Sequence, residues 1–208
     1  MSGMFIYWDN SNIYHEAQRL AEEREQTPGA RYLIRIHFEN LLRLAHADRP
    51  LTKALAAGSV PPELRQLWNR LENQDVEVRL FNRGTRDRGE QETPDQWLQL
   101  RMLEDAFDYN GDTGTVALLT GDGAGYFDGR GFHRTLERIH KRSWRIEILS
   151  WRHACNRKMR EWAEENGLFI ALDDYYQAIT FREPSRPGHV FAEARAQGSL
   201  DLSRRPTL

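Results

Sequence analysis

Short apolar runs rich in strand-forming residues alternate with stretches of helical periodicity along most of this chain. Four runs stand out, at residues 4–8 (MFIYW), 76–81 (VEVRLF), 115–120 (TVALLT) and 146–150 (IEILS), and a weaker fifth lies at 168–172 (LFIAL). Such alternation is typical of an α/β protein with a mainly parallel sheet that is covered by helices on both faces. The runs at 4–8 and 115–120 are almost uninterrupted apolar, as in strands that are buried on both sides.

Segments with helical spacing fill the intervals between these runs, at residues 40–46, 62–73, 95–108, 132–142 and 154–166. Thr93 and Pro94 form an N-cap and a first-turn proline for the third of them. Asn166 and Gly167 end the last one. We therefore expect a single domain over residues 1–181. Residues 182–208 are rich in Pro, Gly, Ser and Arg, which indicates an extended or partly ordered tail.

Several classes of protein are excluded or disfavoured by simple counts. No run approaches 18 uncharged apolar residues, so no membrane span is expected. The N-terminus lacks the basic and apolar regions of a secretory signal, which favours a cytoplasmic protein. Cys155 is the single cysteine, so neither an internal disulfide nor a cysteine-based zinc site can form. The sequence leaves the oligomeric state open, and a homo-oligomer remains compatible with it.

Three acidic residues are expected at one edge of the predicted sheet. Asp9 directly follows the first strand and Asp122 follows the third, while Asp95 opens the helix after the polar loop at 82–92. The carboxyl ends of parallel strands and the loops that follow them share one edge, where α/β proteins bind ligands. Converging carboxylates repel one another unless a cation lies between them. An oxygen-only ligand set suits Mg²⁺ or Mn²⁺, which activate water and stabilise phosphoryl transition states.

Asparagines and glycines surround these acids. Asn10 and Asn12 are placed to orient a ligand, to bind the metal's water or to contact a phosphate. The glycines at positions 121, 123 and 125 allow a backbone to approach a phosphate closely.

Each acid also has an ordinary structural interpretation. Asp9 is a suitable helix cap, Asp122 fits a Gly-Asp-Gly turn, and Asp95 complements a helix dipole. Asp128 is either a further ligand or a turn residue, and Glu92 is a second candidate for an additional acid. Turn and helix-cap chemistry accounts for each acid taken alone. It accounts less well for the placement of all three at one edge of the sheet.

The net charge of −2 conceals a strong asymmetry. Residues 130–160 hold ten basic residues against two acidic ones, so the rest of the chain sums to about −10. Basic clusters attract phosphates, and the interleaved Trp144 and Trp151 are candidates for base stacking. A solvated helix face with buried tryptophans is the alternative. The expected nucleic-acid contacts are Arg130, Arg134, Arg138, Lys141, Arg142, Arg83 and Arg86.

The order and spacing of these motifs resemble those of the NYN domain family, which belongs to the PIN-like nucleases. The resemblance rests on the first strand followed by DNSN, on Pro94-Asp95 opening a helix, on LLTGDG at 118–123 and on DDYY at 173–176. It covers roughly residues 4–181. It implies a PIN-like, Rossmannoid three-layer α/β/α sandwich and metal-dependent cleavage of RNA, with Asp9, Asp95 and Asp122 as the acids that carry it.

Two positions depart from the family pattern. Relatives often carry an acid two residues after the GD aspartate and another six residues after the helix-opening aspartate, where this chain has Ala124 and Arg101. These departures leave two alternatives: one metal ion suffices, or Asp128 or Glu92 takes the place of a lost ligand.

Three functional hypotheses follow. The leading one is an endoribonuclease that depends on Mg²⁺ or Mn²⁺. The second is a catalytically degenerate RNA-binding or adaptor module, which would bind RNA without cleaving it under any divalent ion. The third is a small-molecule phosphatase or nucleotide hydrolase, which would turn over mononucleotides and be indifferent to charge reversal at Arg138, Lys141 and Arg142. The sequence does not name the RNA target or the biological pathway.

Overall fold

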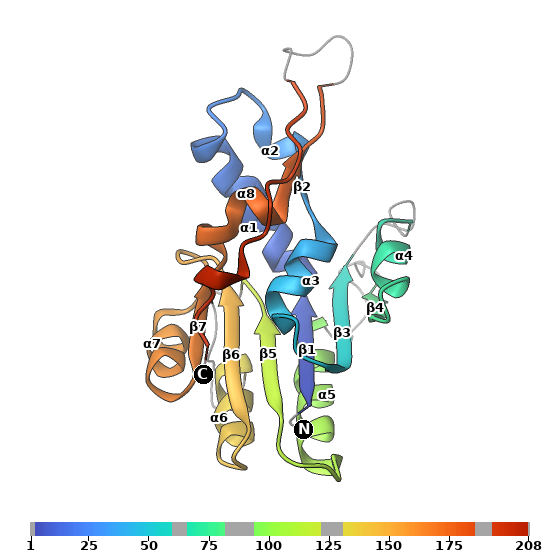
Figure 1. The fold of residues 1–208 in the computed structure, drawn as a ribbon, viewed down its shortest axis with the longest axis vertical. Helices are drawn as coiled ribbons and strands as arrows, with labels where there is room; N and C mark the ends of the chain where they lie inside the picture. The colour runs from blue at the N-terminus through green and yellow to red at the C-terminus, as the bar shows by residue number, and fades with distance from the viewer. Residues whose placement is uncertain (1–2, 60–65, 82–93, 122–130, 186–192, 208) are drawn as a thin grey trace, which may run out of the picture.

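The computed structural model describes residues 3–59, 66–81, 94–121, 131–185 and 193–207. Its centre is a six-stranded sheet of order β4-β3-β1-β5-β6-β7, in which every neighbouring pair is parallel (Figure 1). A separate antiparallel pair, β2 and β8, lies beyond the carboxyl edge of this sheet. The strands are β1 (Met4–Asp9), β2 (Ile34–Ile36), β3 (Leu51–Ser59), β4 (Glu77–Phe81), β5 (Thr115–Leu119), β6 (Arg145–Ser150), β7 (Leu168–Ala171) and β8 (Thr180–Arg182).

Helices cover both faces of the sheet, which confirms the three-layer α/β/α architecture. The helices are α1 (Asn10–Arg24), α2 (Ala30–Leu33), α3 (Phe38–His46), α4 (Gln66–Glu72), α5 (Pro94–Asp108), α6 (Phe132–His140), α7 (Arg157–Asn166) and α8 (Tyr176–Ile179), with the 3₁₀ turns η2 (Leu172–Tyr175) and η3 (Leu202–Arg204). Helices α1, α3, α4 and α8 pack on one face, and α5, α6 and α7 pack on the other. No helix in the described ranges is long and apolar enough to cross a membrane.

Strand β1 supplies side chains to two separate cores. Ile6 and Trp8 point to the α1 and α3 face, whereas Phe5 and Tyr7 point to the α5 face. This alternation explains why the strand is apolar at every position, because neither of its faces meets water. It also directs the side chain of Asp9, two residues after Tyr7, to the α5 side.

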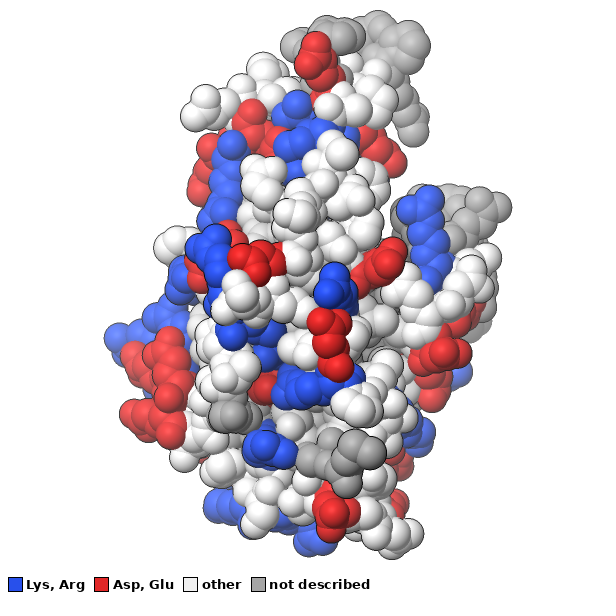
Figure 2. Space-filling model, in the orientation of Figure 1, with Lys and Arg blue, Asp and Glu red and all other residues white. Residues whose placement is uncertain are grey.

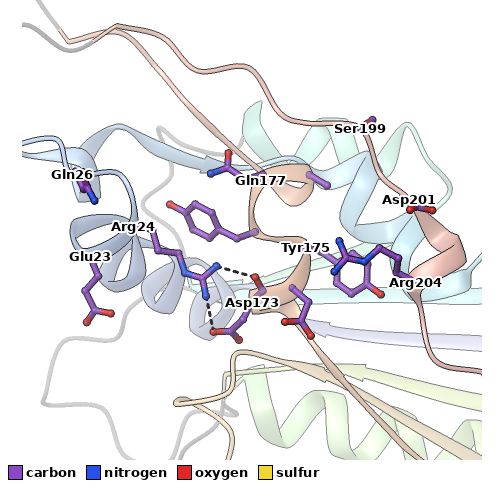
Figure 3. Close-up of a pocket in the computed structure, with 12 residues that line it drawn as sticks. Glu23, Arg24, Gln26, Asp173, Tyr175, Gln177, Ser199, Asp201 and Arg204 are labelled. Atoms are coloured by element: carbon purple, nitrogen blue, oxygen red, sulfur yellow. Dashed lines mark hydrogen bonds and ion pairs between the residues drawn. The ribbon is translucent and has the colours of Figure 1, made fainter.

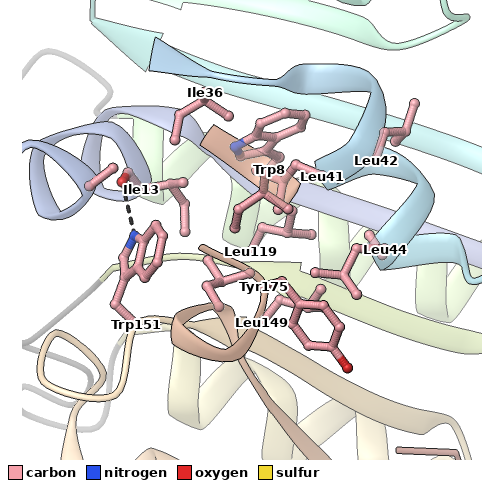
Figure 4. Packing of buried hydrophobic residues seen from close by; sticks show 14 of the residues in the cluster. Trp8, Ile13, Ile36, Leu41, Leu42, Leu44, Leu119, Leu149, Trp151 and Tyr175 are labelled. Carbon is pink, nitrogen blue, oxygen red and sulfur yellow. Dashed lines mark hydrogen bonds between the residues drawn. The ribbon is translucent and has the colours of Figure 1, made fainter. Parts of the chain in front are cut away.

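The core on the α1 and α3 face contains three tryptophans, Trp8, Trp68 and Trp151, of which the first and last are labelled in Figure 4. Trp8 makes an edge contact with the ring of Phe38, at 5.4 Å between centroids. Trp151 is fully buried and its Nε1 donates to the carbonyl oxygen of Ile13 at 3.0 Å. Trp144 is buried on the opposite face against Phe5. Trp144 and Trp151 are therefore core residues, which confirms the interpretation of buried tryptophans and leaves neither ring to stack on a nucleobase.

Strand β3 has no counterpart in the sequence prediction. Its residues, LTKALAAGS, are mostly small and have a low intrinsic preference for strands. The strand nevertheless lies between β1 and β4, where Ala54, Ala56 and Ala57 are buried. Gly58 shows how little room there is, because a Cβ at this position would lie 2.6 Å from the ring of Trp68. Burial between two strands has decided the conformation here, against local propensity.

The described part of the C-terminal segment runs along the domain and is anchored by arginines. Arg195 forms ion pairs with Glu25 of the turn after α1, at 2.7 Å. Further on, Arg205 is buried and contacts Glu147 of β6, whose side chain is also paired with Arg49. These contacts join an extended segment to the turn after α1 and to β6 of the sheet.

Candidate active site

Asp9 ends β1 and caps the first turn of α1. Its carboxylate accepts hydrogen bonds from the backbone N–H of Asn12 at 3.5 Å and from Nδ2 of Asn12 at 2.5 Å. The hydroxyl of Thr120, at the end of the neighbouring strand β5, donates to Oδ2 at 3.4 Å. Only 1% of Asp9 is exposed. The predicted cap role is real, but it leaves a charged group buried in the centre of the carboxyl edge.

Burial and a second acid disfavour the ionised form of Asp9. Desolvation is the larger cause and the charge of Asp95 is the next, and together they raise the pKa of Asp9 to about 7. The hydrogen bonds from Asn12 and Thr120 act in the opposite direction. Two acids close enough to repel, one of them buried, make an electrostatically unfavourable pair that a cation would relieve.

Helix α5 brings Asp95 to this edge. Asp95 is the second residue of α5 and lies in its first turn. The middle of the helix is held to the sheet by Asp105, which accepts from the hydroxyl of Tyr7 at 2.8 Å and from Nζ of Lys53 at 2.7 Å. Because α5 runs antiparallel to β1, fixing Asp105 beside Tyr7 places the start of the helix at the end where Asp9 lies.

The two asparagines have different surroundings. Asn12 points its amide nitrogen at Asp9 and fixes the orientation of that carboxylate. Asn10 begins α1, and its Oδ1 is buried without a hydrogen-bond partner among the residues that the structure describes. A buried amide oxygen normally has a partner. This oxygen, on the residue that follows Asp9 in the chain, is therefore a candidate for binding a ligand.

The third expected acid lies outside the described residues, as do Asp128 and Glu92. Asp122 directly follows Gly121, which is described and lies against α1. A Cβ on Gly121 would approach the carbonyl oxygen of Asn12 to 2.8 Å. The end of β5 thus meets the first turn of α1. Within the described ranges, no group of three or more His, Cys, Asp or Glu side chains has the arrangement of a metal site.

The basic segment is divided between the two ends of the sheet. Helix α6 begins beside α5, where the N–H of Gly131 donates to Oε1 of Gln99 at 3.1 Å. Arg134 lies in this first part and pairs with Glu137 at 2.7 Å. The helix then runs away from the carboxyl edge. Arg142 lies in the turn before β6, with its guanidinium 4.1 Å from the ring of Phe107 at the far end of α5.

The structure therefore does not bring all the expected nucleic-acid contacts together. Arg134 lies near the site, exposed Arg138 is one turn further along α6, and exposed Lys141 lies with Arg142 at the opposite end. Arg130, Arg83 and Arg86 lie outside the described residues. On the face shown in Figure 2, acidic and basic side chains are interspersed and do not form one basic surface.

Two residues, Thr120 and Arg101, make contacts that the sequence did not predict. Thr120 is fully buried and supports Asp9, although it stands within the LLTGDG motif as an ordinary strand-end residue. Arg101, at the position where an acid is often found, pairs with Glu104 at 2.8 Å. Its Nε is buried and has no hydrogen-bond partner among the described residues. The position six residues after Asp95 on α5 is thus held by a cation that is paired with Glu104.

A cavity of about 640 Å³ lies away from the candidate site, beside the C-terminal half of α1 (Figure 3). Arg24 donates there to the carbonyl oxygen and the carboxylate of Asp173. Arg24 ends the helix that begins next to Asp9, which separates the two places by about 20 Å at 1.5 Å per residue. This cavity is therefore not part of the candidate site.

The described donor set fits a hard divalent cation. It consists of the carboxylates of Asp9 and Asp95 and the amide oxygen of Asn10, which has no partner among the described residues. Oxygen donors of this kind are those that Mg²⁺ and Mn²⁺ prefer. The raised pKa of Asp9 reflects its burial and the nearby charge of Asp95, which together outweigh the hydrogen bonds to its carboxylate.

Comparison with known proteins identifies the domain. The family model named NYN domain matches residues 4–172, from the first residue of β1 to the first residue of η2. No curated protein and no solved structure matches the chain. The matched region contains Asp9, Asp95 and the whole parallel sheet. The chain therefore belongs to the NYN domain family, and so to the PIN-like nuclease superfamily.

Proposed function

We propose that the protein is an endoribonuclease that hydrolyses RNA phosphodiester bonds with Mg²⁺ or Mn²⁺ as cofactor. The observation that carries the proposal is the pairing of buried Asp9 with Asp95 at the carboxyl edge of the central strands. Asp122, the next residue after Gly121, is proposed as the third metal ligand. Asp128 and Glu92 are proposed as reserve acids. When bound there, a divalent cation would activate water and stabilise the negative charge that develops on the phosphate.

The protein's own groups would orient this reaction. Asn12 and Thr120 hold the carboxylate of Asp9 in one position, so that its oxygens need not reorganise during the reaction. The Oδ1 of Asn10 would accept a hydrogen bond from the attacking water or contribute to the ligand set. Arg134, at the near end of α6, is proposed to contact the RNA backbone. Arg130, Arg83 and Arg86 are proposed for the same role, because their segments follow β5 and β4 in the chain.

The Asp95→Asn variant tests the metal-site assignment. We expect the rate of RNA cleavage in Mn²⁺ to fall by about 10²- to 10³-fold, because a group that binds the cofactor has lost its charge. The rate is measured with end-labelled mixed-sequence RNA, and EDTA should abolish it. Asp108→Asn is the matched control: it changes an exposed aspartate on the same helix, about 20 Å further along. Equal rates for the two variants would contradict the assignment.

A catalytically degenerate RNA-binding module is the second candidate. The cation at Arg101, in place of an acid, is the observation that favours it. This alternative predicts salt-dependent binding of RNA and no cleavage in Mg²⁺ or Mn²⁺ by the wild-type protein. The same assay therefore separates the two proposals.

A further inference from the structure

A groove opens at the carboxyl edge of the sheet, where α1 begins. It has a volume of about 370 Å³ and lies between α1, the corner from β2 to α3, α4 and β8. Figure 2 shows the surface hollowed where α4 stands away from the upper part of the molecule. Asn10, which immediately follows Asp9, forms part of its wall. A ligand in this groove would thus touch the residue that borders the proposed metal.

Half-buried rings line the groove, and their positions are fixed. Phe38 is held by its edge contact with Trp8, and the rings of His37 and Phe181 meet edge to face at 6.4 Å. Tyr14 is fixed through its hydroxyl, which accepts from Nε2 of Gln18 at 3.2 Å and from Arg35 at 3.4 Å. Rings that are already held in place bind a flat apolar ligand with little loss of side-chain entropy.

Polar groups complete the groove. The Nδ1 of His37 accepts from the backbone N–H of Asn40 at 3.2 Å, so the neutral ring carries its proton on Nε2 and can donate from there. The pKa of His37 is lowered, and burial of the ring is the largest cause. The ring is therefore neutral at pH 7. Arg35, paired with Glu183 at 2.8 Å, and the exposed Arg70 also line the groove. The groove thus combines aromatic side chains and hydrogen-bond donors with two arginines and two glutamates, Glu39 and Glu183.

We propose that this groove binds one unpaired nucleobase of the RNA strand, adjacent to the phosphodiester held at Asp9 and Asp95. The assignment rests on the proposed ribonuclease function. A nucleobase offers the two features that the groove matches, a flat face for the rings and polar edges for the donors, and its backbone carries the phosphate that arginines attract. Continuity with Asn10 favours a strand that passes from the metal site into the groove over an unrelated ligand.

Substitution of Tyr14 tests the groove without requiring cleavage. In EDTA, we expect Tyr14→Ala to bind single-stranded RNA about tenfold more weakly than wild type, the scale of one lost stacking contact. Tyr14→Phe retains the ring and should stay within about twofold. Tyr32→Ala is the matched control, because Tyr32 is 69% exposed on α2 and is not among the residues that line the groove. Affinity is measured by fluorescence anisotropy, and melting temperatures establish that each variant is folded.

An RNA that lacks one base locates the contact. We expect one abasic position, next to the cleaved bond, to weaken binding to wild type about tenfold and to have no further effect on Tyr14→Ala. A 2-aminopurine at that position should be quenched by wild type and not by Tyr14→Ala. If the losses from the abasic site and from Tyr14→Ala are independent at every position, the proposal is overturned and the groove serves another class of ligand, such as a peptide.

The two proposals fail in different ways. Coupled binding losses without any metal-dependent cleavage would leave the nucleobase site standing and remove the ribonuclease assignment. Cleavage that depends on Asp95, together with unchanged binding by Tyr14→Ala, would leave the ribonuclease assignment standing and remove the nucleobase site.

Discussion

Replacing Asp9 with asparagine is expected to reduce RNA cleavage by at least about 10³-fold while making the metal-free protein more stable. Activity falls because the buried carboxylate at the centre of the proposed site is lost. Asparagine keeps the shape of the side chain and remains a good helix cap, so the first turn of α1 should persist. Loss of activity with a gain in stability is the signature of a residue retained for function.

The gain in stability should depend on pH in a defined direction. The pKa of Asp9 is raised from an ordinary 3.8 to about 7 in the folded protein. Between these values the unfolded chain releases this proton while the folded chain keeps it, so wild-type stability falls as the pH rises, and above about 7 the loss is complete. Asp9→Asn lacks this loss. Its advantage in EDTA should be small at pH 4 and up to about 4 kcal/mol at pH 8.

Chemical denaturation at several pH values measures this difference, with Asp108→Asn as the control that should follow wild type. A variant that keeps wild-type cleavage would remove Asp9 from the site. If Asp9→Asn instead unfolds more easily than wild type at pH 8, the carboxylate has a structural role that outweighs its burial cost.

Glu147→Gln is expected to destabilise the protein by about 3–5 kcal/mol. The side chain of Glu147 is fully buried and binds Arg49 at 2.6 and 2.7 Å. Its second partner, Arg205, has a side chain that is only 2% exposed. Neutralising Glu147 therefore leaves a guanidinium buried without a counter-charge, and desolvated charge of this kind is costly.

Urea denaturation of Glu147→Gln and of Glu77→Gln, an exposed glutamate on β4, gives the comparison. The control should lie within about 0.5 kcal/mol of wild type. Adding Arg205→Met to Glu147→Gln should recover part of the loss, because it removes the unpaired charge. If Glu147→Gln matches the control, the buried cluster contributes nothing and the C-terminal segment is not anchored by it.

Much of the candidate site could be predicted from the sequence because a simple rule governs it. In a parallel sheet, residues that follow strands share one edge, so Asp9 and the helix opened by Asp95 could be placed together from the sequence. The positions of the basic residues in segment 130–160 could not be predicted in this way. A count of charges along the chain does not show that α6 runs antiparallel to the strands and carries Arg142 to the opposite end.

The remaining differences come from tertiary context. Strand β3 is formed by small residues that fit between β1 and β4, and its sequence has no strand signal of its own. The groove is assembled from five elements, most of them distant in the chain, and nothing in the sequence relates Tyr14 to Phe181. The partners of Glu147 are equally distant: Arg205 lies 58 residues later in the chain. Such contacts follow from the folded arrangement alone.

Cleavage of end-labelled RNA over a Mn²⁺ titration, with analysis of the product ends, tests the central claim most directly. Hydrolysis by activated water at a metal site needs no RNA 2′-hydroxyl. We predict no cleavage in EDTA, rates that rise and saturate with Mn²⁺, and products that end in a 5′-phosphate and a 3′-hydroxyl. Cleavage that persists in EDTA or yields 2′,3′-cyclic phosphates would contradict the account.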